Sequence, residues 1–446
     1  MGVKGRWHMW SQGSERRCGA LWRQRDFRLF WFGESVNQIG NSLAVVVMSL
    51  LAVTVLDATP FQVGLLAVLR YLPWLLIGLP VGVWIDRLPS GKVMVVTDLV
   101  ASACFASVPV AAWLDLLTIE HVLAVAFLSG TAAVFFDTAY QVMVPAVVDS
   151  ADLMEGNAKL RGSQSVAHLA GISLGGLLAQ AIGAATALLA NAASFLVSVA
   201  CLVRIRDVRC RRSDSRVHPL SSERRQPLRR SIADGIGFVA TDPYLRPITG
   251  WTTVSNFGLA GYDALIMLFL IREVGVGPGL AGLLLTTGGV GAILGALLAR
   301  RIAAGFGTAR SLLLCGLVLS PPVLLVPLTS PGFGVVFYVI GMLVCITGVA
   351  MSNVIVASFR QSYAPAGMLG RVTATTRVLL TGTAPAGALA GAMLGTRLGT
   401  RAALWIMLGL VASAGSILLT RAFVGQRDLP RAVVPAAPAA SGAAGL

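Results

Sequence analysis

The stretch that decides the fold is GLPVGVWIDRLPSGK, residues Gly78 to Lys92. Its apolar half carries two glycines four residues apart, Gly78 and Gly82, and such a pair predicts a helix face that a neighbouring helix can approach closely. The charged pair Asp86-Arg87 follows one turn later, and a Pro-Ser-Gly turn then leads to Lys92. An apolar helix that ends in a charged turn predicts a hinge at a membrane surface.

The composition of the whole chain also points to a membrane. Of 446 residues, 56% are hydrophobic and 12% are charged, whereas soluble domains carry roughly 25% charged residues. The net charge of +15 fits Lys and Arg gathered in cytoplasmic loops better than it fits nucleic-acid binding. The six cysteines are scattered and show no metal-ligand spacing, so they predict neither disulfides nor a metal site.

Apolar runs of about 20 residues, the length that crosses a bilayer, predict twelve membrane-spanning helices. They fall at 28–53, 62–84, 93–114, 119–141, 160–182, 185–204, 247–271, 279–299, 311–328, 332–357, 372–395 and 400–421. On this map nearly all of the 35 Lys and Arg residues lie at the two termini and in the even-numbered connections, which predicts that these parts are cytoplasmic. We therefore expect a multi-pass protein of the cell membrane with both termini inside.

The spans divide six and six around an arginine-rich linker. We expect a cytoplasmic N-terminal segment (1–27), a six-helix bundle (28–204), a basic cytoplasmic linker (205–246), a second six-helix bundle (247–421) and a disordered cytoplasmic tail (422–446). The frame of the second span returns in the eighth span as Gly291-x3-Gly295-x3-Ala299-Arg300, without the acid. The expected fold class is therefore an all-α membrane protein of two six-helix pseudo-repeats, which is what a transporter needs to rock one half against the other.

Gly82, Asp86, Arg87 and Lys92 resemble, in type and spacing, the loop between the second and third spans of the major facilitator superfamily. The Gly-Arg that follows Asp-Arg in the family is replaced here by residues 88–91, Leu-Pro-Ser-Gly. The resemblance covers roughly residues 26–421. It implies the family's twelve-helix fold, alternating access and a monomer.

A second match lies before the eleventh span, where Gly370-Arg371 is similar to the sequence of many members of the family. An acid is favoured at a helix start and beside a guanidinium. Resemblance and charge together predict an inner latch between Asp86 and Arg371.

Two further stretches resemble exporters of the same family. Phe136-Asp137 through Pro145, with Asn157-Ala158, is similar to the branch of enterobactin exporters and macrolide efflux proteins. The fifth span, Ala167-x3-Gly171-Ile172-x2-Gly175-Gly176, resembles the glycine-rich antiporter motif, with Ala and Ile where the family has Gly and Pro. Close packing of small residues explains the same glycines equally well. The fourth span also lacks the arginine that proton-coupled drug exporters usually carry before a glycine.

Polar residues inside spans are the candidate site residues, because charges in a bilayer usually face a cavity or a partner. Glu34, Asn37, Gln38 and Asn41 share one face of the first span, and we favour cavity lining over hydrogen bonding between helices.

The remaining charges form two layers, with Glu34, Asp137 and Arg377 near the cytoplasmic third of the membrane and Arg70 and Asp263 nearer the outer third. Glu34 and Asp137 are candidate proton-binding or cation-binding acids, because a low-dielectric cavity favours protonation. Arg70 is a candidate ion-pair partner or contact for anionic substrate groups. A permanent ion pair is the alternative for Arg70 and the favoured interpretation for Arg377.

Four other residues complete the set. Phe257 and Tyr262 are candidate substrate contacts, because they lie toward the middle of the seventh span. Asp98 is interpreted as a loop anchor, and His168 as a packing or hydrogen-bonding residue.

No phosphate-binding loop and no hydrolase or metalloprotease motif occurs in the chain, so the sequence predicts neither an enzyme nor a cofactor. The preferred function is a secondary active transporter, namely a proton-coupled antiporter that exports a small amphiphilic molecule of the drug, antibiotic or siderophore class. An uptake symporter or uniporter for a small metabolite is the alternative within transport. A non-transporting membrane scaffold or sensor is the alternative of another class. The expected partners are the substrate, protons or another coupling ion, and the lipid bilayer.

Overall fold

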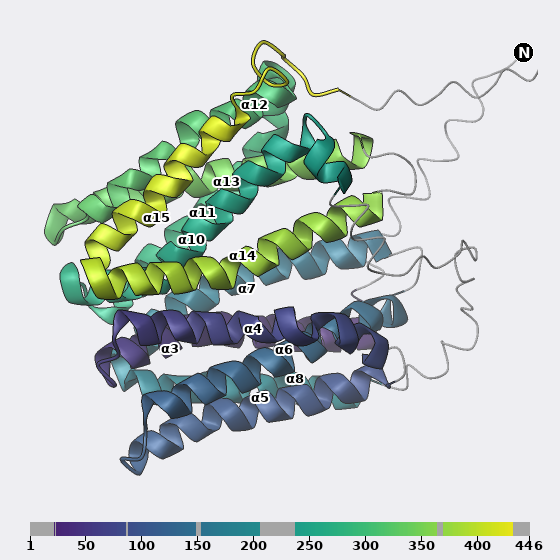
Figure 1. Ribbon diagram of the computed structural model, residues 1–446. Coiled ribbons are helices and arrows are strands. Elements are labelled where there is room, and N and C mark those ends of the chain that lie inside the picture. Colours follow the sequence, from purple (N-terminus) through teal and green to yellow (C-terminus); the bar gives the residue numbers. More distant parts are fainter. Residues whose placement is uncertain are drawn as a thin grey trace, which may run out of the picture.

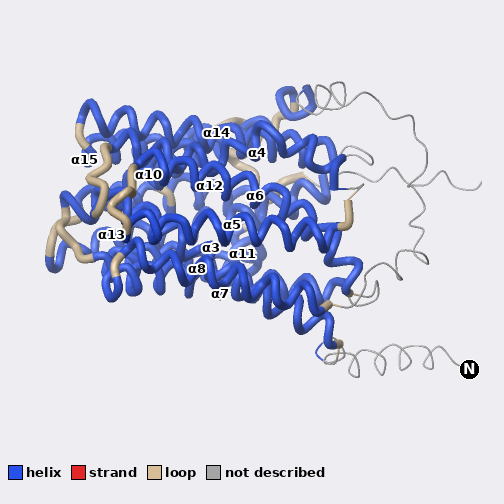
Figure 2. The backbone as a smooth tube through the Cα atoms, turned by 90° about the horizontal axis from the view of Figure 1, so that it is seen from below, coloured by secondary structure: helices blue, strands red, loops and turns tan. Residues whose placement is uncertain are grey.

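The computed structural model describes residues 22, 24–85, 88–148, 153–205, 237–363 and 369–430. Within these ranges the chain is almost entirely helical and contains no strand (Figure 2). Residues 1–21 of the predicted N-terminal segment and residues 206–236 of the predicted linker lie outside the described residues.

The first half consists of six helices that match the first six predicted spans. They are α3 (Arg25–Thr54), α4 (Pro60–Ile85), α5 (Ser90–Trp113), α6 (Ile119–Val147), α7 (Leu153–Ile182) and α8 (Ala184–Arg204). Helix α3 packs along α7 and α8, while α5 packs against α6 and α8, and α4 packs against α6.

The second half repeats this order with more irregular helices. Its segments are α10 (Leu245–Leu268) with η2 (Phe269–Glu273), α11 (Pro278–Phe306), α12 (Thr308–Leu314) with η3 (Cys315–Leu319) and η4 (Pro321–Leu328), η5 (Gly332–Gly334) with α13 (Val335–Tyr363), α14 (Leu369–Leu398), and α15 (Thr400–Ala414) with η6 (Gly415–Leu418). Two consecutive prolines, Pro321 and Pro322, lack the amide protons that an α-helix would use, and the chain turns into a 3₁₀ helix there.

In the part of the chain that the structure describes, eleven of these segments are long and apolar enough to cross a membrane. The remaining one, α14, is a 30-residue helix that corresponds to the predicted span 372–395. It packs against α10, α15 and α4. The predicted fold class, an all-α membrane protein of two six-helix halves, is confirmed.

The helices are longer than the predicted spans at several ends. Helix α6 continues to Val147, α7 begins at Leu153 and α11 continues to Phe306. Hydropathy detects only the stretch that lies in hydrocarbon, whereas a helix can continue into the polar region beyond it.

The two ends of the helix bundle differ in how the halves meet. We call the end at which α8 ends and α10 begins the linker end, and the end at which α3 ends and α4 begins the far end. Figure 1 shows the two halves close together at the far end, on the left, and spread apart toward the linker end. The largest cluster of buried apolar side chains contains residues of both halves, including Leu50 of α3 and Leu265 of α10. The other two clusters each belong to one half.

The beginning of the predicted disordered tail is ordered. Phe423 is fully buried, 6.0 Å from the ring of Tyr244. The amide of Thr308 donates to Asp428 Oδ1 at 2.9 Å, which anchors the segment at the start of α12. The prediction of disorder from residue 422 is therefore wrong as far as residue 430, and residues 431–446 lie outside the described range.

The two glycine pairs of the predicted repeat have different surroundings. A Cβ on Gly291 would lie 2.8 Å from the carbonyl oxygen of Leu343 on α13, and a Cβ on Gly295 would collide with the carbonyl oxygen of Thr347. Among the described residues, a Cβ on Gly78 would meet only Trp74 of its own helix, at 3.6 Å. The described residues therefore show no close approach of another helix at Gly78 in this conformation, and the predicted approach stays a prediction.

Candidate functional site

Glu34 lies at the junction of three helices of the first half. Its side chain is 8% exposed. The amide of Gln164, on α7, donates to Glu34 Oε1 at 3.2 Å and lies 3.4 Å from the hydroxyl of Tyr140, on α6. The guanidinium of Arg161 donates to Gln164 Oε1 at 3.3 Å, so a neutral amide lies between the carboxylate and this cation.

Asp137 belongs to the same region. It is exposed on α6 and is close enough to Glu34 for the two carboxyl groups to interact electrostatically. The structure thus brings together the two acids that the sequence proposes for ion coupling.

Asn37 and Asn41 do not share this setting. Asn37 is 1% exposed, and its amide donates to Asp98 Oδ1, on α5, at 3.1 Å. Asn41 is half-buried and donates to Asn37 Oδ1 at 2.8 Å. In this conformation Asn37 thus makes a hydrogen bond between helices, which was the alternative to cavity lining. Asp98 is no loop anchor, since it lies inside α5 and is 1% exposed.

Arg70 and His168 form a basic region farther along the first half. Arg70, on α4, is half-buried, with its guanidinium 5.9 Å from the centre of the Tyr71 ring. It is close enough to His168, on α7, for an electrostatic interaction. His168 Nδ1 lies 2.9 Å from the hydroxyl oxygen of Ser42, on α3, which confirms the predicted hydrogen bond.

The second half contributes an exposed acid beside a buried tyrosine pair. The hydroxyl oxygens of Tyr262, on α10, and Tyr338, on α13, are 2.8 Å apart, and both side chains are buried. Asp263 is the single exposed residue between Gly261 and Leu270, and its charge is felt by both tyrosines. Tyr262 is therefore not available to a substrate in this conformation, whereas the half-buried Phe257 is more accessible.

The glycines of the fifth span pack in two directions. A Cβ on Gly171 would collide with the carbonyl oxygen of Ile39 on α3, and one on Gly175 would lie 3.0 Å from that of Leu43. A Cβ on Gly176 would instead lie 2.6 Å from the carbonyl oxygen of Pro278 in the other half. Gly171 and Gly175 of the stretch that resembles the antiporter motif thus pack within the first half, and Gly176 lies where the halves cross.

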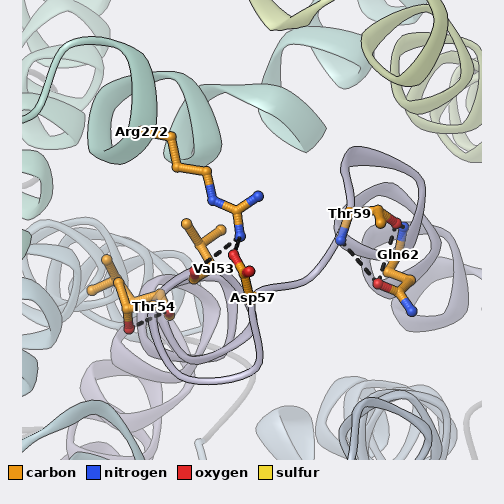
Figure 3. A network of polar contacts seen from close by, with 7 residues as sticks. Val53, Thr54, Asp57, Thr59, Gln62 and Arg272 are labelled. Atoms are coloured by element: carbon orange, nitrogen blue, oxygen red, sulfur yellow. Dashed lines mark hydrogen bonds and ion pairs between the residues drawn. The ribbon is translucent and has the colours of Figure 1, made fainter.

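A polar network closes the far end, as Figure 3 shows. Arg272, at the end of η2, donates one hydrogen bond to Asp57 and another to the carbonyl oxygen of Val53 at 3.2 Å. Asp57 lies in the loop after α3 in a left-handed conformation (φ +48°), which Asp tolerates better than most residues. Thr59 and Gln62 exchange hydrogen bonds at the start of α4 and stabilise the loop on its other side.

Several predicted site residues cannot be placed. Asp86 and Arg87 lie outside the described residues, and the side-chain surroundings of Gly82, Gly370, Arg371 and Arg377 are likewise not described. Lys92 is exposed in the first turn of α5, where its amide donates to the carbonyl oxygen of Pro89 at 2.9 Å.

Sequence reasoning missed Gln164 and Tyr338. The spacing of Arg161, Gln164 and His168, three and four residues apart, places them on one face of α7, and this pattern was available as a signal for Gln164. Nothing comparable marks Tyr338, because one tyrosine at the beginning of a span is typical of the membrane interface.

Comparison with known proteins gives one family and several structural neighbours. Residues 30–385 match the family model described as Major Facilitator Superfamily. No curated protein sequence matches significantly. A crystal structure of a mutant of the nucleoside transporter NupG has a TM-score of 0.70 at 12% identity and covers 88% of this chain and 98% of its own.

Two bacterial structures are similar to the same extent. An inward-facing bacterial homologue of the iron transporter ferroportin has a TM-score of 0.68 at 17% identity, covering 88% of this chain and 98% of its own. An inward-facing, unoccupied bacterial homologue of the human lysosomal transporter Spinster has a TM-score of 0.67 at 12% identity, covering 88% and 95%. At these identities the likeness is one of fold.

Proposed function

This chain belongs to the major facilitator superfamily, and on that premise we propose that it is a proton-coupled antiporter that exports a small amphiphilic molecule of the drug, antibiotic or siderophore class. It acts as a monomer in the cell membrane, with the linker end in the cytoplasm. The excess of Lys and Arg in the linker supports this orientation.

The observation that carries the proposal is the environment of Glu34. A buried carboxylate is costly unless it is paired, and the hydrogen bond that Glu34 accepts comes from the neutral amide of Gln164. Gain or loss of a proton at Glu34 therefore changes the energy of this three-helix junction. Because Asp137 is close, a proton arriving at either acid also affects the other.

The contact between α7 and α11 supports access to this region from the linker end. A Cβ on Gly282 would lie 2.8 Å from the Cα of Gly176, and a Cβ on Gly289 would collide with Leu169. Farther along the same face of α7, Val166 is 65% exposed, and a Cβ on Gly162 would meet no described residue within 4 Å. The halves thus separate beyond Leu169, on the side where Glu34 lies, so a molecule enters between them from the cytoplasm.

The proposed substrate class is supported by three side chains of the membrane-spanning helices that are at least partly exposed. Arg70 offers a cation, Asp263 offers an anion, and Phe257 offers apolar surface. A molecule with one large apolar part and a few polar groups matches these contacts better than a sugar, which needs many hydrogen-bonding partners.

Uptake of a small metabolite is the second candidate. The observation that favours it is Ile172, which replaces the proline of the antiporter motif in the otherwise glycine-rich stretch. In that case Glu34 carries protons inward together with the substrate.

The test uses inside-out membrane vesicles with an imposed proton gradient and a pH-sensitive dye. Labelled amphiphilic antibiotics and siderophores are added to vesicles that contain wild type, E34Q or E120Q. Glu120 is an exposed acid at the start of α6, so E120Q is the matched control. We expect substrate-dependent proton release in wild type and E120Q and none in E34Q. Release that persists in E34Q would remove Glu34 as the coupling residue, and proton flux of opposite sign would establish uptake.

A further inference from the structure

A second buried carboxyl group, that of Asp98, lies close to Glu34 inside the first half. Its side chain is 1% exposed on α5. Oδ1 accepts the amide of Asn37 at 3.1 Å. Oδ2 makes no hydrogen bond of ordinary geometry within the described part of the chain, although the hydroxyl of Ser198, on α8, is near enough to interact with the carboxyl group. A buried carboxyl oxygen without a partner needs an explanation.

The groups around Asp98 do not provide a counter-charge. The titratable side chain on α3 that interacts with Asp98 electrostatically is Glu34. Helix α8 contributes the Cys201 thiol, and α6 contributes Asp137 and Tyr140, both within reach of Glu34. On α7, Lys159 pairs with Glu155 and Arg161 is bonded to Gln164, and Arg204 at the end of α8 acts on Cys201. Within the described ranges no Lys or Arg forms an ion pair with Asp98.

The packing around Asp98 leaves little space for a metal ion. A Cβ on Gly33 would lie 3.0 Å from the Cβ of Cys201, and a Cβ on Gly40 would collide with the hydroxyl of Ser194, so α3 and α8 are in close contact on either side of Asn37. Hard cations need six or more oxygen ligands, whereas a single carboxylate stands here among amides and hydroxyls. In the described residues no three His, Cys, Asp or Glu side chains are grouped for metal binding. A proton needs no additional space.

We propose that Asp98 is a second proton-binding group of this transporter and that it acts as a pair with Glu34. The inference rests on the proposed function, since it assumes that Glu34 binds the coupling proton. Two neighbouring carboxylates that form no ion pair with a cation do not both ionise readily, and they titrate as a unit. The step is a simple equilibrium in which one proton from water adds to Asp98 Oδ2 and later leaves from the same atom.

The chain Asn41–Asn37–Asp98 connects this pair to the first span. Asn41 is half-buried and donates to Asn37, which donates to Asp98. A protonated Asp98 can in turn donate from Oδ2 to the hydroxyl of Ser198. Protonation therefore adds a hydrogen bond between α5 and α8 and weakens the one between α3 and α5, which couples proton binding to the packing of α3.

The experiment compares three variants by infrared difference spectroscopy of the purified, full-length protein during pH titration. D98N keeps an oxygen that accepts the Asn37 amide, so it preserves the packing. The double variant N37D/D98N moves the carboxyl group to the other side of the same hydrogen bond. E34Q removes the partner. Proton release per transported molecule is measured in vesicles for the same proteins.

We expect a protonated-carboxyl band in wild type that is lost in D98N, regained in N37D/D98N and shifted in its pH midpoint in E34Q. We also expect D98N to bind substrate with fewer protons released per molecule and the double variant to recover the wild-type ratio. A D98N protein with an unchanged band and an unchanged ratio would overturn the proposal and leave Asp98 a packing residue. A band that titrates with sodium in place of protons would overturn it in favour of sodium. Should wild type release no protons with any compound while the band still titrates at Asp98, the proposed export fails and the proton-binding group stands.

Discussion

The far end and the linker end of the interface between the halves use similar residues and behave in opposite ways. At the far end Gly176 meets Gly282, and a Cβ on Gly64 would collide with Ala392 of α14. Toward the linker end, a Cβ on Gly162 would meet none of the described residues within 4 Å, and one on Gly78 would meet, among them, only its own helix. Small residues therefore do not by themselves hold two helices together. They allow contact, and the relative rotation of the halves decides which end uses it.

Helix α4 shows this most clearly. Gly78 and Gly82 follow Gly64 by 14 and 18 residues. Both separations are close to whole numbers of turns at 3.6 residues per turn, so the three glycines share one face of α4. Gly64 uses that face at the far end, against α14. We expect the same face at Gly78 to meet α14 when the linker end closes.

The largest expected effect on the closure of the far end is that of G176V. Its side chain would push α7 away from the backbone of Pro278 and Gly282, which lie 2.6 and 2.8 Å from the position of a Cβ. Overpacking of this kind costs about 1–3 kcal/mol, and the cost applies to the conformation with a closed far end. We expect the population to shift toward an open far end. Electron-spin distances between labels at Asp115 and Ser330, exposed positions in far-end loops of the two halves, would lengthen.

The matched control is G162A on the same helix. Because no atom of the part of the chain that the structure describes lies within 4 Å of that Cβ, we expect the far-end distances of G162A to remain those of wild type. Wild-type distances in G176V as well would mean that the crossing of α7 and α11 does not hold the far end closed.

The second largest effect is expected for G78V, which disfavours closure of the linker end, whereas G176V disfavours closure of the far end. In this conformation a Cβ on Gly78 meets, among the described residues, only Trp74 at 3.6 Å, so the substitution is tolerated. When the linker end closes, the valine would separate α4 from α14 at a cost of about 1–2 kcal/mol. Labels at Val203 of α8 and Phe306 of α11, both exposed, would then stay far apart when substrate is added, and transport would slow. Normal shortening of this distance in G78V would show that the glycine face has no role in closure.

The sequence predicts the helices well because hydropathy measures the property that a bilayer selects. The predicted span 185–204 differs from α8, Ala184–Arg204, by one residue. The ordered segment around Phe423 was missed because a few Ala-rich and Pro-rich residues beyond it dominate the composition of the tail.

The site is predicted only in part. Glu34 stands out because charges are rare in spans. The sequence does not decide between cavity lining and the hydrogen bond between helices that Asn37 makes, because a polar helix face does not reveal whether a cavity or another helix covers it. The same limit hid the partnership of Asn37 with Asp98, which depends on how α3, α5 and α8 pack. The far-end ion pair was not foreseen either, since Asp57 and Arg272 are far apart in the chain and meet only because the halves converge.

The smallest effect is expected from that ion pair. The Asp57 side chain is 94% exposed and that of Arg272 is 34% exposed, and exposed pairs contribute about 0–1 kcal/mol. Its loss in D57N should therefore change the ratio of closed to open far ends by at most roughly fivefold. We expect a modest lengthening of the Asp115–Ser330 label distance that disappears at high salt, where wild type loses the same attraction.

The adjacent residue provides the control for this last comparison. Glu273 pairs with Arg401 at 3.5 Å, and both belong to the second half, so R401Q removes a far-end ion pair without removing a link between the halves. The exchange D57R/R272D keeps the link with reversed charges and should restore the wild-type distance. If R401Q opens the far end as much as D57N does, the effect comes from the charge of that surface and not from a bond between the halves. If D57N opens the far end and R401Q does not, the ion pair between the halves stabilises the closed far end in addition to the contacts between small residues.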